Sequence, residues 1–100
     1  MTRLRTALLL TLLSAGSAAA AEPLYLGSWD CEVATFTFTE TTYSNGDTPM
    51  PIRKIEREDG NYHFFFDDDY SFWVSGLTKT SMQWLSDASG DSFSCTRAKD

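Results

Sequence analysis

The chain has 100 residues, with 8 Lys and Arg against 14 Asp and Glu, and a formal net charge of −6. An acidic chain of this kind is poorly suited to nucleic acid or to anionic membrane surfaces, and it attracts basic partners instead. Aromatic residues make up 14% of the sequence, a high share that suits β-strands.

Residues 1–21 have the pattern of a secretory signal peptide. Arg3 and Arg5 precede a short apolar run, and small residues ending in a series of alanines follow it. The apolar run is too short to cross a bilayer, which takes about 20 residues. We therefore expect cleavage after Ala20 or Ala21, and a mature protein that is periplasmic or secreted and soluble.

The mature part, residues 22–100, fits a single domain with one modest core. It keeps 6 basic and 14 acidic residues, which gives a net charge of −8. Its two cysteines, Cys31 and Cys95, lie near its two ends. An even number of cysteines in a small exported chain predicts a disulfide between them, rather than a metal or catalytic site.

No stretch of the mature part sustains apolar residues at helical spacing, so we expect an all-β fold. Residues 26–39 read as one long strand whose apolar positions change parity: Trp29, Cys31 and Val33 are odd, and Phe36 and Phe38 are even. A change of parity predicts a bulge near Ala34 or Thr35.

The middle of the chain predicts further strands and turns. Residues 41–51 contain an Asn-Gly-Asp turn signal and two prolines, which indicate a loop or a hairpin with a frayed edge strand. Residues 52–58 predict a strand with one wet face. The following Asp59-Gly60 pair predicts a tight turn into the next strand.

The stretch NYHFFFDDDYSFWV, residues 61–74, predicts a β-hairpin whose loop is formed by residues 67–69. Alternation places three facing pairs on one apolar face: Phe66 with Tyr70, Phe64 with Phe72, and Tyr62 with Val74. The other face carries His63 opposite Trp73 and Phe65 opposite Ser71. That face is unusually aromatic for a solvent side.

The last strands complete the predicted fold. A strand that holds Met82, Trp84 and Leu85 is followed by the turn SDASGD and by a final strand at residues 92–97. Antiparallel pairing of Cys31 with Cys95 places Trp29 opposite Arg97 and Val33 opposite Phe93, with a cation–aromatic contact in the first of these pairs. We expect the first and last strands to close a small antiparallel β-barrel of about six to eight strands.

Motifs for catalysis or metal binding are weak. The three aspartates at residues 67–69 lack the spacing of an EF-hand loop, so a solvated turn is preferred to a Ca²⁺ site, although cation binding stays open. His63 is the only histidine, and a packing role is the default for it. No nucleophile elbow occurs. We therefore expect a binding module without catalytic residues, metal or cofactor.

Two families share motifs with the chain. Gly27-Ser28-Trp29 together with Arg97 resembles the lipocalin-like (calycin) signature, in which a tryptophan of the first strand packs on a late arginine at the closed end of a barrel. This resemblance implies an alternative function, a carrier of a small apolar ligand. Its cavity would be lined by Phe64, Phe66, Phe72 and Trp84.

The second resemblance is to the periplasmic and membrane-bound inhibitors of c-type lysozyme, which are small disulfide-bearing antiparallel barrels. WDC at residues 29–31 looks like their early aromatic-x-Cys, and YSFWVSG at residues 70–76 is similar to their Tyr-x-Phe-Trp-x-x-Gly strand. Cys95 falls where their late cysteine is expected. The sequence departs from the inhibitory loop, because DGNY at residues 59–62 stands where that family carries Ser-Gly-x-x-Tyr, and Ser75 replaces the usual lysine.

Our leading hypothesis is therefore non-enzymatic binding of a basic protein, with inhibition of c-type lysozyme as the specific case. The residues expected to contact the partner come from the predicted hairpin and the turn before it: Gly60, Tyr62, His63, Phe65, Asp67, Asp68, Asp69 and Trp73. A third alternative is that the aromatic outer face forms a homodimer interface.

Overall fold

The computed structural model describes residues 23–99, so the expected signal peptide lies outside the described part. Nine strands follow in chain order: β1 (Gly27–Cys31), β2 (Ala34–Phe38), β3 (Thr42–Ser44), β4 (Met50–Pro51), β5 (Lys54–Glu58), β6 (Asn61–Phe65), β7 (Ser71–Ser75), β8 (Ser81–Ser86) and β9 (Ser92–Arg97). All pairings among them are antiparallel, which confirms the predicted all-β class. Across residues 23–99 we find no helix that could span a membrane.

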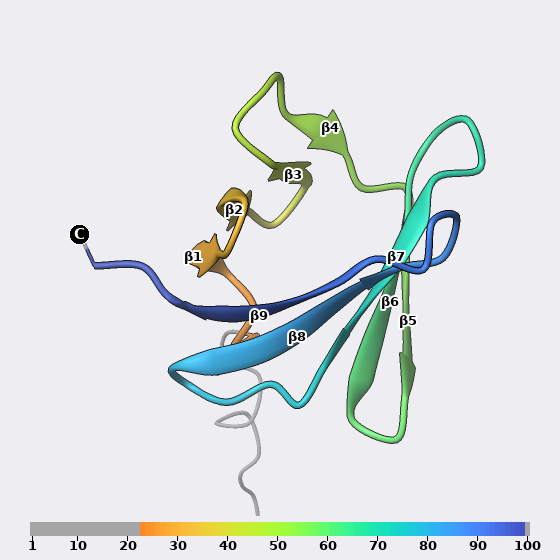
Figure 1. Cartoon of the computed structure of the whole chain (residues 1–100). Helices are drawn as coiled ribbons and strands as arrows, with labels where there is room; N and C mark the ends of the chain where they lie inside the picture. Colours follow the sequence, from red (N-terminus) through yellow and green to blue (C-terminus); the bar gives the residue numbers. More distant parts are fainter. Residues whose placement is uncertain (1–22, 100) are drawn as a thin grey trace, which may run out of the picture.

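The strands form one curled sheet in the order β4-β3-β2-β1-β9-β8-β7-β6-β5 (Figure 1). The sheet is a half-barrel, since β4 and β5 are its two edges and do not pair with each other. The prediction of a closed barrel with six to eight strands was therefore wrong in closure and in strand count. Strand β4 has two residues and ends in Pro51, which has no N–H to donate, so it offers little for a ladder with β5.

Residues 26–39 are two strands rather than one bulged strand. Strands β1 and β2 form a hairpin in which Trp29 faces Phe36 and Cys31 faces Ala34. The two-residue turn between them explains the change of parity, because partners across such a turn have one odd and one even number. Glu32 in this turn has a φ of 58°, and its carboxylate accepts a hydrogen bond from the Ser94 N–H.

The predicted pairing of Val33 with Phe93 was also wrong. Val33 lies in the turn after β1 and is 66% exposed, so no strand residue remains at this position to face Phe93. Strand β1 pairs with β9 only at Trp29 with Arg97 and at Asp30 with Thr96.

The hairpin of β6 and β7 has the predicted register. Its four ladder pairs include Phe64 with Phe72 and His63 with Trp73. Beyond the ladder, the Phe66 N–H donates to the Tyr70 carbonyl, so residues 67–69 are the loop. The preceding turn was predicted correctly too: Asp59 and Gly60 both have positive φ, 54° and 85°, as a two-residue turn of type I′ requires.

Aromatic rings fill the concave side of the sheet. Phe72 lies at its centre, with its ring centroid 4.6 Å from that of Tyr43, 5.1 Å from Trp84 and 5.2 Å from Phe66. The buried core comprises Tyr25, Trp29, Cys31, Phe36, Phe38, Tyr43, Phe64, Phe66, Phe72, Val74, Met82, Trp84 and Cys95. Burial raises the pKa of the Tyr43 hydroxyl above its ordinary value.

The seam between β1 and β9 joins the two ends of the domain. Cys31 and Cys95 form the predicted disulfide. The predicted cation–aromatic contact is also present, with the Arg97 guanidinium 4.0 Å from the ring centroid of Trp29. Arg97 donates from Nη1 to the Leu26 carbonyl at 2.6 Å, and Gly27 leaves room for it, because a Cβ there would lie 3.0 Å from this nitrogen.

Removal of the disulfide tests how far this seam stabilises the domain. The bridge spans 64 residues of sequence, so its loss in the double variant Cys31→Ala/Cys95→Ala should lower the free energy of unfolding by about 4 kcal/mol in the chain-entropy model. Urea titration of the mature protein, followed by tryptophan fluorescence, measures this change. Wild-type protein under reducing conditions is the control and should match the variant, whereas an unchanged midpoint would contradict the expectation.

Candidate functional site

The convex side of β6 and β7 carries the predicted aromatic cluster. The His63 ring stacks on Trp73, with centroids 3.9 Å apart and an angle of 17° between the ring planes. The Phe65 ring centroid lies 4.2 Å from that of His63, and Lys54 on β5 lies 4.4 Å from the Phe65 ring. These contacts follow from strand alternation, because Phe64 and Phe72 take the interior positions between them.

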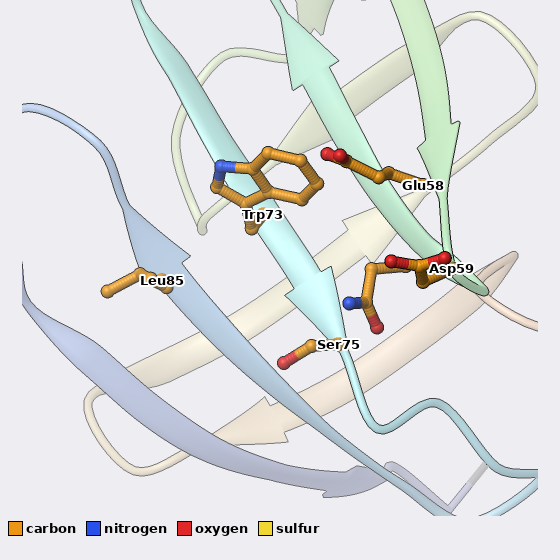
Figure 2. Close-up of a pocket in the computed structure, with 6 residues that line it drawn as sticks. Glu58, Asp59, Trp73, Ser75 and Leu85 are labelled. Carbon is orange, nitrogen blue, oxygen red and sulfur yellow. The ribbon is translucent and has the colours of Figure 1, made fainter.

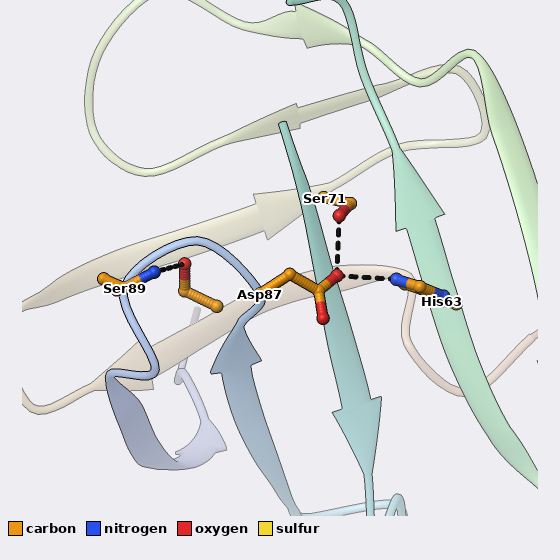
Figure 3. A network of polar contacts seen from close by, with 5 residues as sticks. His63, Ser71, Asp87 and Ser89 are labelled. Carbon is orange, nitrogen blue, oxygen red and sulfur yellow. Dashed lines mark hydrogen bonds and ion pairs between the residues drawn. The ribbon is translucent and has the colours of Figure 1, made fainter. Parts of the chain in front are cut away.

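Asp87 joins this cluster to the loop after β8 (Figure 3). His63 Nε2–H donates to Asp87 Oδ2 at 2.6 Å, and Ser71 Oγ donates to the same oxygen, also at 2.6 Å. The hydrogen bond from Ser71 and that from His63 hold the pKa of the Asp87 carboxyl below its ordinary value. The His63 side chain is 16% exposed, so the network fixes its ring against Trp73.

The three residue types of this network are those of a hydrolase triad, but their arrangement differs from one. In a triad the histidine lies between the acid and the serine and takes the serine proton. Here Ser71 and His63 both donate to Asp87, and the serine hydroxyl is committed to the carboxylate. This geometry ties β6, β7 and the β8–β9 loop together, and it gives His63 no proton to take from Ser71.

Next to the cluster, the convex side has a hollow of about 410 Å³ (Figure 2). This volume lies within the range of roughly 300–1,000 Å³ that is usual for small-ligand pockets. Six residues line it, and we call the site they form the outer hollow: Glu58, Asp59, Asn61, Trp73, Ser75 and Leu85. Figure 2 shows the Glu58 and Trp73 side chains among the residues that line it.

The register of four strands assembles the outer hollow. Glu58 faces Asn61 across the β5–β6 turn, and Trp73 on β7 faces Leu85 on β8. Leu85 is 40% exposed, one of the few large apolar side chains that lie open to solvent among the described residues. Together with Asp59 of the turn, these pairs place two carboxylates and an apolar side chain around the Trp73 indole.

The carboxylates of the outer hollow are not neutralised. The ion pairs found among residues 23–99 are Arg53 with Asp67, Lys54 with Glu56, and His63 with Asp87. Glu58 and Asp59 take part in none of them, and no lining residue is basic. The hollow therefore presents uncompensated negative charge beside an aromatic ring.

The structure separates the residues that the sequence nominated for partner binding. His63, Phe65 and Trp73 lie together on the convex side, and Gly60 belongs to the turn beside the outer hollow. Tyr62 points to the interior side, where its ring lies 5.0 Å from Tyr25.

The three aspartates of the hairpin loop, Asp67, Asp68 and Asp69, lie at the opposite end of β6 from the outer hollow. Asp67 forms a forked ion pair with Arg53, which lowers the pKa of the Asp67 carboxyl. Residues 23–99 contain no group of three or more acidic, histidine or cysteine side chains placed to hold a metal ion. The described residues thus give no support for a cation bound at this loop.

Sequence reasoning missed most of the outer hollow and also missed Asp87. A signal for Glu58 and Asn61 was present, because they flank the predicted Asp59-Gly60 turn. Asn61 shares the parity of His63, and Glu58 faces Asn61 across the turn. Leu85 and Asp87 required the β7–β8 register, which pairs Phe72 with Ser86 and so brings Asp87 beside Ser71. Sequence alternation alone does not give that register.

The variant Asp87→Asn tests the network through its pH dependence. Because the folded pKa of Asp87 is lowered, its charge stabilises the fold above the unfolded pKa of about 3.9, and this contribution is lost as the pH falls through the folded value. We expect wild type to be more stable than the variant at neutral pH, and the difference to shrink between about pH 5 and about pH 2. Urea unfolding at a series of pH values measures it.

Asp91→Asn is the matched control, since it makes the same charge change in the same loop. The Asp91 carboxylate has no hydrogen bond in the described part of the chain, so its effect should stay small at every pH. A stability difference for Asp87→Asn that does not change with pH would contradict the role of the charged carboxylate.

Comparison with known proteins gives no assignment for this site. No family model, curated protein or solved structure matches the chain. The lipocalin-like and lysozyme-inhibitor resemblances therefore remain predictions, and function has to be inferred from the geometry of the convex side.

Proposed function

We propose that this protein is a non-enzymatic binding module that takes a basic protein on the convex side of β5–β8, with c-type lysozyme as the first partner to test. The observation that carries this proposal is the outer hollow, where Trp73 lies beside two carboxylates that have no ion pair among the described residues. Aromatic residues at the centre of an interface contribute most of the binding energy in many complexes.

Electrostatics supports a basic partner. The expected mature chain has a net charge of −8, which accelerates encounter with a cationic protein and repels an acidic one. The net charge of the convex side is also negative, since Glu56, Glu58 and Asp59 outnumber Lys54 there. A disulfide is compatible with the periplasmic or extracellular compartment that we propose.

The interior supports the carrier alternative less well. Among the rings that would line a ligand cavity, Phe64 and Phe66 both pack against Phe72, with centroids 5.4 and 5.2 Å from it. Trp84 completes the group at 5.1 Å from Phe72. A ligand among these rings would have to separate contacts that already bury them, whereas a partner on the convex side displaces only water.

Inhibition of a hydrolase by this surface would be steric. The β5–β6 turn projects from the end of the sheet next to the outer hollow (Figure 1). A partner held at the hollow would lie against this turn, which could occlude an active-site cleft without any chemical step. The YSFWVSG motif that resembles the lysozyme inhibitors is centred on β7 and supplies Trp73 to the same surface.

Titration calorimetry of the oxidised mature protein with c-type lysozyme tests the proposal, together with a cell-wall lysis assay. Binding should be weaker at about 0.15 M than at about 0.01 M salt, because the screening length falls from about 30 to about 8 Å. Glu58→Lys should weaken binding about tenfold, since it reverses a charge that lines the outer hollow.

Asp47→Lys is the matched control, because it changes the net charge equally but lies in the β3–β4 loop on the other wing of the sheet. It should weaken binding by less than about threefold, through long-range electrostatics alone. If Glu58→Lys and Asp47→Lys lowered the affinity equally, the interaction would be a non-specific attraction between opposite net charges. Absence of heat at low salt would reject lysozyme as partner, and light scattering of the free protein would then test the homodimer alternative.

A further inference from the structure

We infer that the outer hollow is a receptor for one arginine side chain of the basic partner. This inference rests on the proposed function and adds the chemical group that is recognised. Its basis is the combination of an indole, two uncompensated carboxylates and an apolar wall around a hollow of about 410 Å³.

Trp73 supplies the surface on which a cation stacks. Trp29 and Trp84 are 0% and 5% exposed, whereas Trp73 is half-buried and lines the outer hollow, where a ligand can contact it. Its indole is held in place, since His63 stacks on one face and is itself hydrogen-bonded to Asp87. Trp73 also lines the outer hollow, so a planar cation there can stack on the indole, and tryptophan is the strongest aromatic partner for cations.

The carboxylates supply charge and hydrogen-bond acceptors. Glu58 and Asp59 approach the hollow from the β5–β6 turn, while Trp73 and Ser75 form its β7 side (Figure 2). A guanidinium has five N–H donors in one plane, so it can stack on the indole and donate sideways to carboxylates at the same time. Asn61 and Ser75 add further acceptors at the margin.

Arginine fits this environment better than lysine. An ammonium group is a compact and strongly hydrated charge, and the indole and Leu85 would strip part of its water without offering hydrogen bonds in return. A guanidinium is more weakly hydrated and has apolar faces. Leu85, which is 40% exposed, can cover the methylene stem that carries it.

NMR titration with small blocked amino acids tests the inference without any protein partner. The probes are the N-acetyl amides of arginine, lysine and citrulline, because citrulline has nearly the shape of arginine without its charge. The arginine probe should shift the Trp73 indole N–H and the amides of Asn61 and Ser75 in a saturable manner at millimolar concentrations. The lysine probe should bind more weakly, and the citrulline probe should cause no saturable shift.

Glu58→Gln and Asp59→Asn should each weaken binding of the arginine probe by about two- to fivefold, the range for exposed charge pairs. Asp69→Asn is the control, because Asp69 and Asp59 both have a φ near 60° and asparagine tolerates this conformation. It makes the same charge change at the far end of β6 and should leave the affinity unchanged.

Equal shifts with arginine and citrulline, or equal losses in Asp59→Asn and Asp69→Asn, would overturn the inference. Lysozyme binding that persists in Glu58→Gln without loss would also overturn it and leave the proposed function intact. Arginine binding without any lysozyme binding would instead support the receptor and reject the proposed partner.

Discussion

The two wings of the sheet, β4-β3-β2-β1 and β9-β8-β7-β6-β5, are joined through a ladder of two residue pairs between the first strand and the last. So short a ladder would be weak alone. The Cys31–Cys95 disulfide lies at its end, and Arg97 reinforces it by stacking on Trp29 and donating to carbonyls of the N-terminal segment. The two wings are held around the curve by this small cross-linked region together with rings that meet across the concave side, such as Tyr43 on Phe72 and Phe38 on Phe64.

The aromatic interior makes the convex side available for binding. Because Phe64 and Phe72 already fill the concave side, the alternate positions of the same strands are not needed for the core. The hairpin therefore holds His63 and Trp73 on a rigid backbone, with Asp87 fixing their stack from a neighbouring loop. A binding surface built in this way needs little rearrangement when a partner arrives, which lowers the entropic cost of association.

Sequence alone was sufficient for features encoded within one hairpin. The β6–β7 pairs were predicted in full, because alternation and a polar loop both specify the register. Residues 26–39 were predicted wrongly because a bulge and a two-residue turn both shift the apolar positions from odd to even numbers. In addition, Glu32-Val33 lacks the Asn-Gly sequence that is typical of two-residue turns. The outer hollow could not be predicted, since it combines the β5–β6 and β7–β8 registers with the curvature of the sheet.

The open side of the half-barrel has a consequence for aggregation. Two free sheet edges are templates on which further strands can add, and native β-proteins generally prevent this. Edge β4 offers only two residues, one of them Pro51. Edge β5 is longer but has the sequence KIERE, so an incoming strand would meet charges of both signs at nearly every position. The short length and proline of β4 and the charges of β5 thus disfavour the addition of further strands. The protein can therefore expose an aromatic convex face without polymerising edge to edge.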